Sequence, residues 1–346
     1  MKIKYFAGLV FVVASTLVTK GQDIHFSQIT ESTMFLSPAN TGFFNGYFRA
    51  TANYRNQWQA MNKAFSTSAV AIDGGLFRSK KRPAFMGLGL TFYNDQAGVA
   101  KMRKTGIMLN LSGVLKIGSK SALSVGLAGG TIGTNANYAA LTYESQYNGN
   151  TFDPSIANGE QVYRQFTTVD VGAGIGYEFS TSKRDQDHDD VRSVKVTLGA
   201  YHLNKPEQNF GPGSSYKLPI RYTAAAFINY DIEDTKFTVS PAAIYHMQGN
   251  YSELTMGGII RYRTTSGTKF TGTKSQNAIG FGAYYRTKDA LIPMLAFDFG
   301  DYSFGLSYDV NLSSYRSASN YRGGFEVSIR YNDLASTLFE SRREFR

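Results

Sequence analysis

The chain has 346 residues, a formal net charge of +10, 25 phenylalanines, 23 tyrosines, 35 glycines and no cysteine. The absence of cysteine excludes disulfides, thiolate metal sites and cysteine nucleophiles. A low content of charged residues (18%), with many aromatic residues and only 8 prolines, is typical of an ordered β-rich protein and excludes a disordered chain.

Residues 1–21 have the layout of a secretory signal peptide. Lys2 and Lys4 precede an apolar run over residues 6–18, and Thr19 and Gly21 supply the small side chains that a cleavage site requires. This run is shorter than the ~18 apolar residues that a membrane-spanning helix needs, and no other stretch of the sequence approaches that length. If the protein crosses a membrane, it must therefore do so as a β-barrel.

Residues 22–45 form a segment without regular alternation that carries large apolar side chains such as Phe26, Met34, Phe35 and Phe43. Two placements are open for it: inside a barrel as a partial plug, or across the periplasmic mouth. The domain boundaries expected from the sequence are a signal peptide at 1–21, this segment at 22–45, a barrel at 46–332 and a periplasmic tail at 333–346.

Between residues 46 and 332, apolar and polar side chains alternate with a period of two, which is typical of β-strands with two unlike faces. Val169, Val171 and Ile175 share one face of such a segment, opposite Asp170 and Glu178. Most segments are near the ~9–11 residues of a tilted transmembrane strand and exceed the ~5–6 of soluble strands. About fourteen occur, beginning near Tyr47, Phe65, Phe85, Thr105, Ala122, Phe166, Arg192, Ile220, Lys236, Tyr251, Asn277, Ala290, Tyr302 and Gly324.

The predicted fold is therefore all-β, a transmembrane antiparallel β-barrel of about 14 strands whose two ends lie in the periplasm. On this topology the longest connections, roughly 132–165 and 204–219, are extracellular, and short turns such as 118–120 are periplasmic; the long turn at 264–276 is an exception. A large soluble β-protein is the alternative. Outward aromatic residues at the periplasmic strand ends predict an interfacial girdle: Tyr177, Phe179, Tyr230, Tyr262, Phe297, Phe299 and Tyr331.

Charged side chains on the opposite face are expected to point into the lumen, because a charge facing the middle of the bilayer costs ~2–4 kcal/mol. Their mixed signs favour a cross-linked lumen over an ion-selective pore. The charges expected in the lumen are Arg49, Asp170, Glu178, Lys195, Arg221, Glu253, Arg261, Arg263, Glu326 and Arg330.

The sequence predicts no catalytic, metal or cofactor site. The run DQDHDD at 185–190 does not match the glycine-bearing calcium loop, and the glycine-rich runs at 172–176 and 267–275 do not match nucleotide-binding loops. No Gly-x-Ser-x-Gly motif occurs, so an enzymatic barrel is the weaker alternative. The basic residues form no stripe of the kind that binds nucleic acid, and the cluster at 78–82 is expected to meet anionic lipid or a partner. The histidines lack metal-ligand spacing: His25, His188, His202 and His246.

Aromatic residues also gather in the long extracellular connection, where protein interfaces favour tyrosine and tryptophan anchors. They are candidate partner contacts, unless they fold back over the barrel mouth. The end of the first strand is a second candidate surface, where Trp58 alternatively anchors in lipid. The candidates are Tyr138, Tyr143, Tyr147, Phe152 and Tyr163 in the connection, and Tyr54, Arg55 and Trp58 at the rim.

Several short motifs occur in a fixed order: QDIHFSQ at 22–28, LSPANTG at 36–42, YRNQW at 54–58, GLGL at 87–90, YNDQAG at 93–98 and GFEVS at 324–328. This series resembles the PorP/SprF family of outer-membrane proteins in the Bacteroidetes type IX secretion and gliding machinery. Ser37, where the family often has asparagine, and the tail at 333–346 depart from the family pattern.

The resemblance implies a non-enzymatic protein of the outer membrane that uses no cofactor. Members help to export large adhesins, or anchor them at the cell surface by their C-terminal domains, and some act with periplasmic peptidoglycan-linked components. Outer-membrane lipid is the other expected partner, and nucleic acid is not expected. Two further functions stay open: a porin-like or hydrophobic-solute transport barrel, and a structural anchor between the outer membrane and peptidoglycan.

Overall fold

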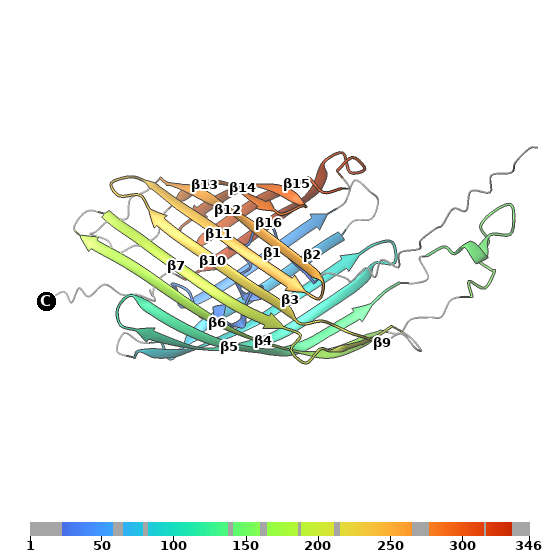
Figure 1. The fold of residues 1–346 in the computed structure, drawn as a ribbon, viewed down its shortest axis with the longest axis horizontal. Helices are drawn as coiled ribbons and strands as arrows, with labels where there is room; N and C mark the ends of the chain where they lie inside the picture. The colour runs from blue at the N-terminus through green and yellow to red at the C-terminus, as the bar shows by residue number, and fades with distance from the viewer. Residues whose placement is uncertain are drawn as a thin grey trace, which may run out of the picture.

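The computed structural model describes residues 23–57, 65–78, 82–137, 141–159, 165–185, 188–210, 215–264, 277–314 and 316–333. Within these ranges the chain forms a closed antiparallel barrel of fourteen strands (Figure 1). They are β1 (Phe48–Gln57), β2 (Phe65–Leu76), β3 (Ala84–Ala97), β4 (Met102–Ile117), β5 (Ser121–Asn135), β6 (Phe166–Asp185), β7 (His188–Tyr201), β10 (Arg221–Asp231), β11 (Phe237–Gln248), β12 (Tyr251–Arg263), β13 (Ala278–Arg286), β14 (Ala290–Phe299), β15 (Tyr302–Asn311) and β16 (Arg322–Asn332).

Each barrel strand pairs with its neighbours along the chain, and β1 pairs with β16 to close the barrel. The all-β fold, the barrel and its fourteen strands were predicted from the sequence and are confirmed. The signal peptide, Trp58, Tyr138, Tyr163, the turn at 265–276 and the tail after residue 333 lie outside the described residues, as do the side chains at 185–190. In the part of the chain that is described, no helix is both long and apolar enough to span a membrane.

The strands form because their side chains satisfy two different surroundings at once. On β6, Val169 is 61% exposed on the outer face, whereas the next residue, Asp170, is 2% exposed on the inner face. The same alternation puts Ile175 outside and Glu178 inside. An apolar outer face suits lipid, and a polar inner face suits a closed lumen.

The two rims of the barrel differ. We call the end where β1 begins and β16 ends the terminal rim, and the opposite end the loop rim. Two long connections lie at the loop rim: residues 136–165, and residues 202–220 between β7 and β10 (Figure 1). The second contains a separate hairpin of β8 (Glu207–Asn209) and β9 (Ser215–Lys217), which the sequence did not reveal because each strand has only three residues.

Aromatic side chains surround the terminal rim on its outer face. Tyr331 packs against Phe48 and Tyr302, with ring centroids 6.3 and 5.1 Å apart, and Phe237 lies 5.3 Å from Tyr262. Rings at this depth are typical of a girdle at the membrane–water interface.

Residues 23–45, which we call the plug, lie inside the barrel rather than across its mouth. Asp23 is next to residues at the loop rim, and the Asn45 carbonyl accepts a hydrogen bond from Asn332 at the terminal rim. The plug contains two short 3₁₀ turns, η1 (Thr33–Phe35) and η2 (Pro38–Asn40). Its apolar side chains are buried against the lumen wall, including Phe43, which is fully buried. The plug therefore runs through the lumen from one rim to the other.

Candidate functional site

Glycines on the lumen face of four strands let the main chain of the plug approach the wall closely. A Cβ atom on Gly126 of β5 would overlap the main chain of Pro38 and Ala39, and one on Gly87 of β3 would overlap Thr41. The same holds for Gly174 on β6 against the Ser37 hydroxyl, and for Gly199 on β7 against Leu36. Two neighbouring wall hydroxyls hold the seated segment: Ser124 donates to the Ala39 carbonyl (2.7 Å) and Ser112 to that of Thr41 (2.5 Å).

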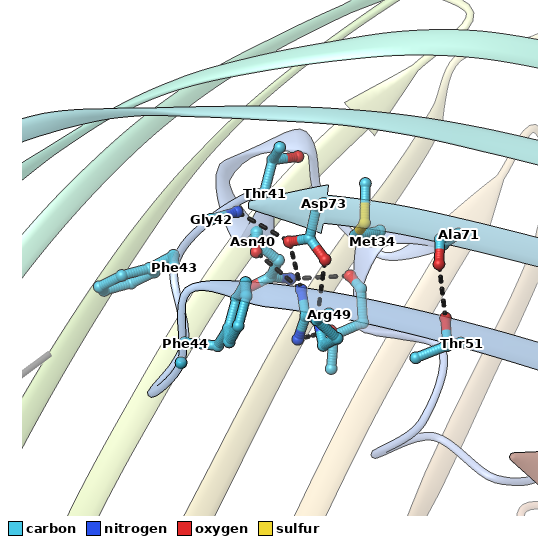
Figure 2. A network of polar contacts seen from close by, with 12 residues as sticks. Met34, Asn40, Thr41, Gly42, Phe43, Phe44, Arg49, Thr51, Ala71 and Asp73 are labelled. Atoms are coloured by element: carbon cyan, nitrogen blue, oxygen red, sulfur yellow. Dashed lines mark hydrogen bonds and ion pairs between the residues drawn. The ribbon is translucent and has the colours of Figure 1, made fainter. Parts of the chain in front are cut away.

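An arginine–carboxylate clamp on β1 and β2 fixes the end of the plug near the terminal rim (Figure 2). Arg49 donates two hydrogen bonds to Asp73, at 2.9 and 2.7 Å, and a third to the Asn40 carbonyl at 3.1 Å. Asp73 also accepts the Gly42 amide at 2.8 Å, and the Arg49 guanidinium lies 4.3 Å from the centre of the Phe44 ring. Because the pair is bidentate and buried, it defines one position for the plug.

A second buried cluster joins the plug to β1, β13 and β15. Asp309 accepts hydrogen bonds from Arg55 (2.8 Å) and Arg286 (3.0 Å) through one carboxylate oxygen. Its other oxygen accepts the Ser27 hydroxyl of the plug at 2.7 Å, and Arg286 donates to that same hydroxyl at 2.7 Å. Arg286 also pairs with Asp289 at 2.9 Å. The plug thus completes a network that spans several strands near the closing seam, by which we mean the pairing of β1 with β16.

Glu326 on β16 binds the main chain of the plug. Its carboxylate accepts the amides of Ser27 (2.6 Å) and Gln28 (3.1 Å), and its own carbonyl accepts the Gln28 side chain (2.9 Å). Glu326 is 1% exposed, and among the described ion pairs none includes it. Two plug amides therefore supply most of the hydrogen bonding to this carboxylate.

At the loop rim, a histidine between two carboxylates holds the start of the plug. His202 contacts Asp23 of the plug at 3.0 Å through Nε2 and Asp170 of β6 at 2.8 Å through Nδ1. Arg221 lies 2.9 Å from the same Asp23. Burial alone lowers the pKa of His202, but the two carboxylates outweigh it and raise that pKa above its usual value. Burial alone raises the pKa of Asp23, and Arg221 and His202 hold it below its usual range.

This arrangement predicts a pH-dependent anchor for the plug. Because the pKa of His202 is raised on folding, its stabilising contribution is complete below the unfolded value of about 6.5 and is lost as the pH rises through the folded value. We expect protease cleavage of the plug to increase as the pH is raised through the folded-state pKa of His202. In His202→Gln this pH dependence is expected to disappear. His246→Gln is the control, since His246 bonds the Thr223 hydroxyl (3.1 Å) rather than a carboxylate; equal pH profiles for both variants would contradict the prediction.

The ten charged residues expected in the lumen all lie on the inner face. Besides those described above, Arg261 pairs with Asp298 (3.1 Å), Arg263 with Asp231 (3.4 Å) and Arg330 with Glu31 of the plug (2.9 Å). Glu178 and Lys195 face each other across β6 and β7, and Glu253 lies 3.6 Å from Arg286. The mixed signs are thus cross-linked, mostly between wall residues and in part through Asp23 and Glu31 of the plug.

The structure corrects the prediction made for Arg55, which the sequence analysis proposed as a partner contact at the rim. Its side chain is 2% exposed and lies in the lumen, where it binds Asp309 and donates to the His25 carbonyl (2.5 Å). The alternation that starts at Arg49 places Arg55 on the same inner face, so the signal was present in the sequence. Tyr54, its neighbour, lies on the outer face, 41% exposed and 6.0 Å from the Phe325 ring.

The connection after β5 forms a structured loop that extends beyond the loop rim (Figure 1). Within residues 141–159, Gln146 is buried and donates to the Ile156 carbonyl (3.0 Å), and the Asp153 amide donates back to the Gln146 carbonyl (2.8 Å). This frame presents Tyr147 and Phe152, which form an isolated β-bridge and are 57% and 42% exposed. Tyr143 is half-buried in the same loop. Figure 1 shows this loop extending away from the barrel.

Among the residues whose positions are given, no group of three or more histidine, aspartate or glutamate side chains is arranged to hold a metal ion. A cavity of about 20 Å³ lies where Asp23 and Arg221 meet His246 and Glu253, with room for about one water molecule.

The profile of a protein family described as "Type IX secretion system membrane protein PorP/SprF" matches residues 18–331. The chain belongs to the PorP/SprF family. The match confirms the family that the sequence motifs indicated, and it makes this PorP/SprF barrel an outer-membrane component of the type IX secretion system. No protein of curated function matches it significantly.

Several solved structures are similar to this PorP/SprF protein over most of its length. The Ralstonia pickettii toluene transporter TbuX is 9% identical, with 88% of this chain and 93% of that chain covered and a TM-score of 0.46. A Pseudomonas aeruginosa FadL homologue is 10% identical, with 88% and 94% covered and a TM-score of 0.42. BamA from Haemophilus ducreyi is 8% identical, with 83% and 70% covered and a TM-score of 0.43.

Proposed function

We propose that this barrel helps to secrete a large cell-surface adhesin, or anchors it, by binding the C-terminal domain of that adhesin. Membership in a type IX secretion family supports this role, and the structured loop at the loop rim is the observation that carries it. On the usual orientation of bacterial barrels, with both chain ends in the periplasm, this loop lies outside the cell. The proposed role is one of binding and requires no catalytic group.

The loop has the properties of a binding surface. Its hydrogen bonds fix the main chain before any partner arrives, so little ordering entropy is lost on association. Tyr147 and Phe152 expose rings of the kind that carry most of the energy in protein interfaces. A transport function is less well supported, because the plug runs through the lumen that a solute would have to cross.

The test is co-purification of secreted proteins with the full-length barrel from native outer membranes. The double variant Tyr147→Ala/Phe152→Ala is expected to recover at least about tenfold less adhesin, since truncating one interface anchor commonly costs ~2 kcal/mol or more. Tyr302→Ala is the matched control, because Tyr302 is 49% exposed but lies at the terminal rim.

Two outcomes would count against the proposal. Undiminished recovery of adhesin with the double variant would exclude the loop as the contact. If deletion of the barrel left every surface adhesin secreted and attached, the secretion or anchoring role itself would be rejected. Ion conductance or solute uptake by the unmodified barrel would instead favour a transport function.

A further inference from the structure

The lumen wall binds the main chain of the plug at many points, in addition to the side chains of Asp23, Ser27 and Glu31. Arg221 donates to the carbonyls of Ile24 and Phe35, both at 3.1 Å, and Tyr201 donates to that of Met34 at 2.7 Å. On the acceptor side, carboxylates bind plug amides, as Glu326 and Asp73 do. Further wall side chains that donate to plug carbonyls are Arg49, Arg55, Arg78, Ser112, Ser124 and Lys195.

These main-chain contacts determine where a polypeptide runs through the lumen. They discriminate little between sequences, because every residue offers the same carbonyl. Most of the donors are cationic, and charge-assisted hydrogen bonds to carbonyls are stronger than neutral ones. The glycine contacts select for small residues, because Gly87, Gly126 and Gly199 leave space for main chain and little else. The ion pairs of Asp23 and Glu31 select for carboxylates at two other points. The segment that crosses these glycines, residues 36–42, accordingly consists mostly of small residues.

We propose that the lumen is a peptide-binding site, that the plug is its resting occupant, and that a segment of the exported protein replaces the plug there. That the incoming segment belongs to an exported protein rests on the proposed function. That the lumen binds a peptide does not rest on it. The segment that fits has a turn of small residues across the glycines of β3, β5, β6 and β7, flanked by large apolar side chains.

Replacement by a peptide is energetically different from emptying the lumen. If the plug leaves alone, buried arginines and carboxylates lose their partners and must be hydrated, and the pockets of Phe26 and Phe43 lose their contents. If another peptide enters, its carbonyls and amides replace those of the plug, whereas the bonds made by the Asp23, Ser27 and Glu31 side chains are kept only if the peptide carries similar groups. Exchange of the occupant therefore costs less than emptying the lumen.

The test uses the full-length barrel, which has no native cysteine to compete with introduced ones. The variant Ser124→Cys places a thiol beneath the plug, where Ser124 is fully buried and lies against Ala39. The probe is a fluorescent synthetic peptide of residues 22–45 carrying Ala39→Cys, added in excess under mildly oxidising conditions. Each exchange of the plug for the peptide is then trapped as a disulfide, so capture accumulates with time.

The control is Ser121→Cys, on the outer face of the same strand, where Ser121 contacts the Tyr177 hydroxyl and is more exposed than Ser124. We expect Ser124→Cys to capture at least about tenfold more peptide than Ser121→Cys, because seating in the lumen raises the local thiol concentration. Ser112→Cys, with a Thr41→Cys peptide, provides a second pair if the first variant does not fold.

Equal capture by Ser121→Cys, or no capture by either lumen cysteine, would overturn the inference. Because the assay contains no adhesin, these results do not depend on the proposed function. Loss of adhesin binding in the Tyr147→Ala/Phe152→Ala variant with no peptide capture would leave the secretion role standing and remove the peptide-binding lumen. Peptide capture with no adhesin recovered by the unmodified barrel would support the peptide-binding lumen and count against the secretion role.

Discussion

The variant Gly126→Val is expected to release the plug from the lumen while the barrel remains closed. A valine at this position would place its side chain on the main chain of Pro38 and Ala39. Ordinary overpacking costs ~1–3 kcal/mol when side chains can shift, and here the opposing atoms are main chain in a tight turn. The strand itself loses nothing, because valine is well suited to a β-strand. The plug is therefore the part that must move.

Two measurements check this expectation. Limited digestion with a non-specific protease should cleave residues 23–45 in Gly126→Val but leave them intact in the native barrel. In planar bilayers the variant should conduct ions, since an emptied barrel of fourteen strands is wide enough to hold water. Gly129→Val is the matched control, because Gly129 is on the same strand and a Cβ there would meet no atom within 4 Å.

The result would contradict the structure if the Gly126→Val plug stayed protected and the barrel stayed non-conducting. Aggregation of this variant would be separated from plug release by the heat-dependent gel mobility of folded barrels. Gly87→Val offers an independent variant on β3, where the added side chain meets Thr41 instead of Pro38.

The barrel could be predicted from the sequence because its determinants are local. Alternation with a period of two is visible in any ten residues, and it assigns each side chain to lipid or lumen. On β6 the pattern separates Val169 from Asp170 without knowledge of any neighbouring strand. Strand number and order follow, since consecutive strands joined by short turns pair with one another.

The plug could not be predicted in the same way, because its position depends on contacts between distant parts of the chain. Ser27 binds Glu326, 299 residues away, and no local pattern announces that pair. The lumen-facing glycines were visible as small residues on strand faces, but their purpose depends on the plug main chain that lies against them. Arg55 was misassigned because its place at the end of a strand was weighed above the face that alternation gives it.

The second large effect is expected at the buried cluster of the closing seam. In Asp309→Asn, two arginines that are almost fully buried lose the charge that both of them contact. Removing one partner of a buried ion pair commonly destabilises a protein by ~3–5 kcal/mol, because the remaining charge is left uncompensated. Arg286 keeps Asp289, but no other ion pair of Arg55 is present among the described residues. Most of the cost therefore falls on Arg55.

Unfolding of the variant in urea, followed by heat-dependent gel mobility or tyrosine fluorescence, measures this cost. Adding Arg55→Gln to Asp309→Asn should recover part of the lost stability, since it removes the uncompensated charge. Asp298→Asn is the control, because the Asp298–Arg261 pair is more exposed than the Asp309–Arg55 pair, so we expect its loss to destabilise the barrel less. A double variant less stable than Asp309→Asn alone would show that Arg55 stabilises the seam through its bond to the plug carbonyl of His25, rather than through Asp309. The plug would then add to the stability that the hydrogen-bonded pairing of β1 with β16 already gives the barrel.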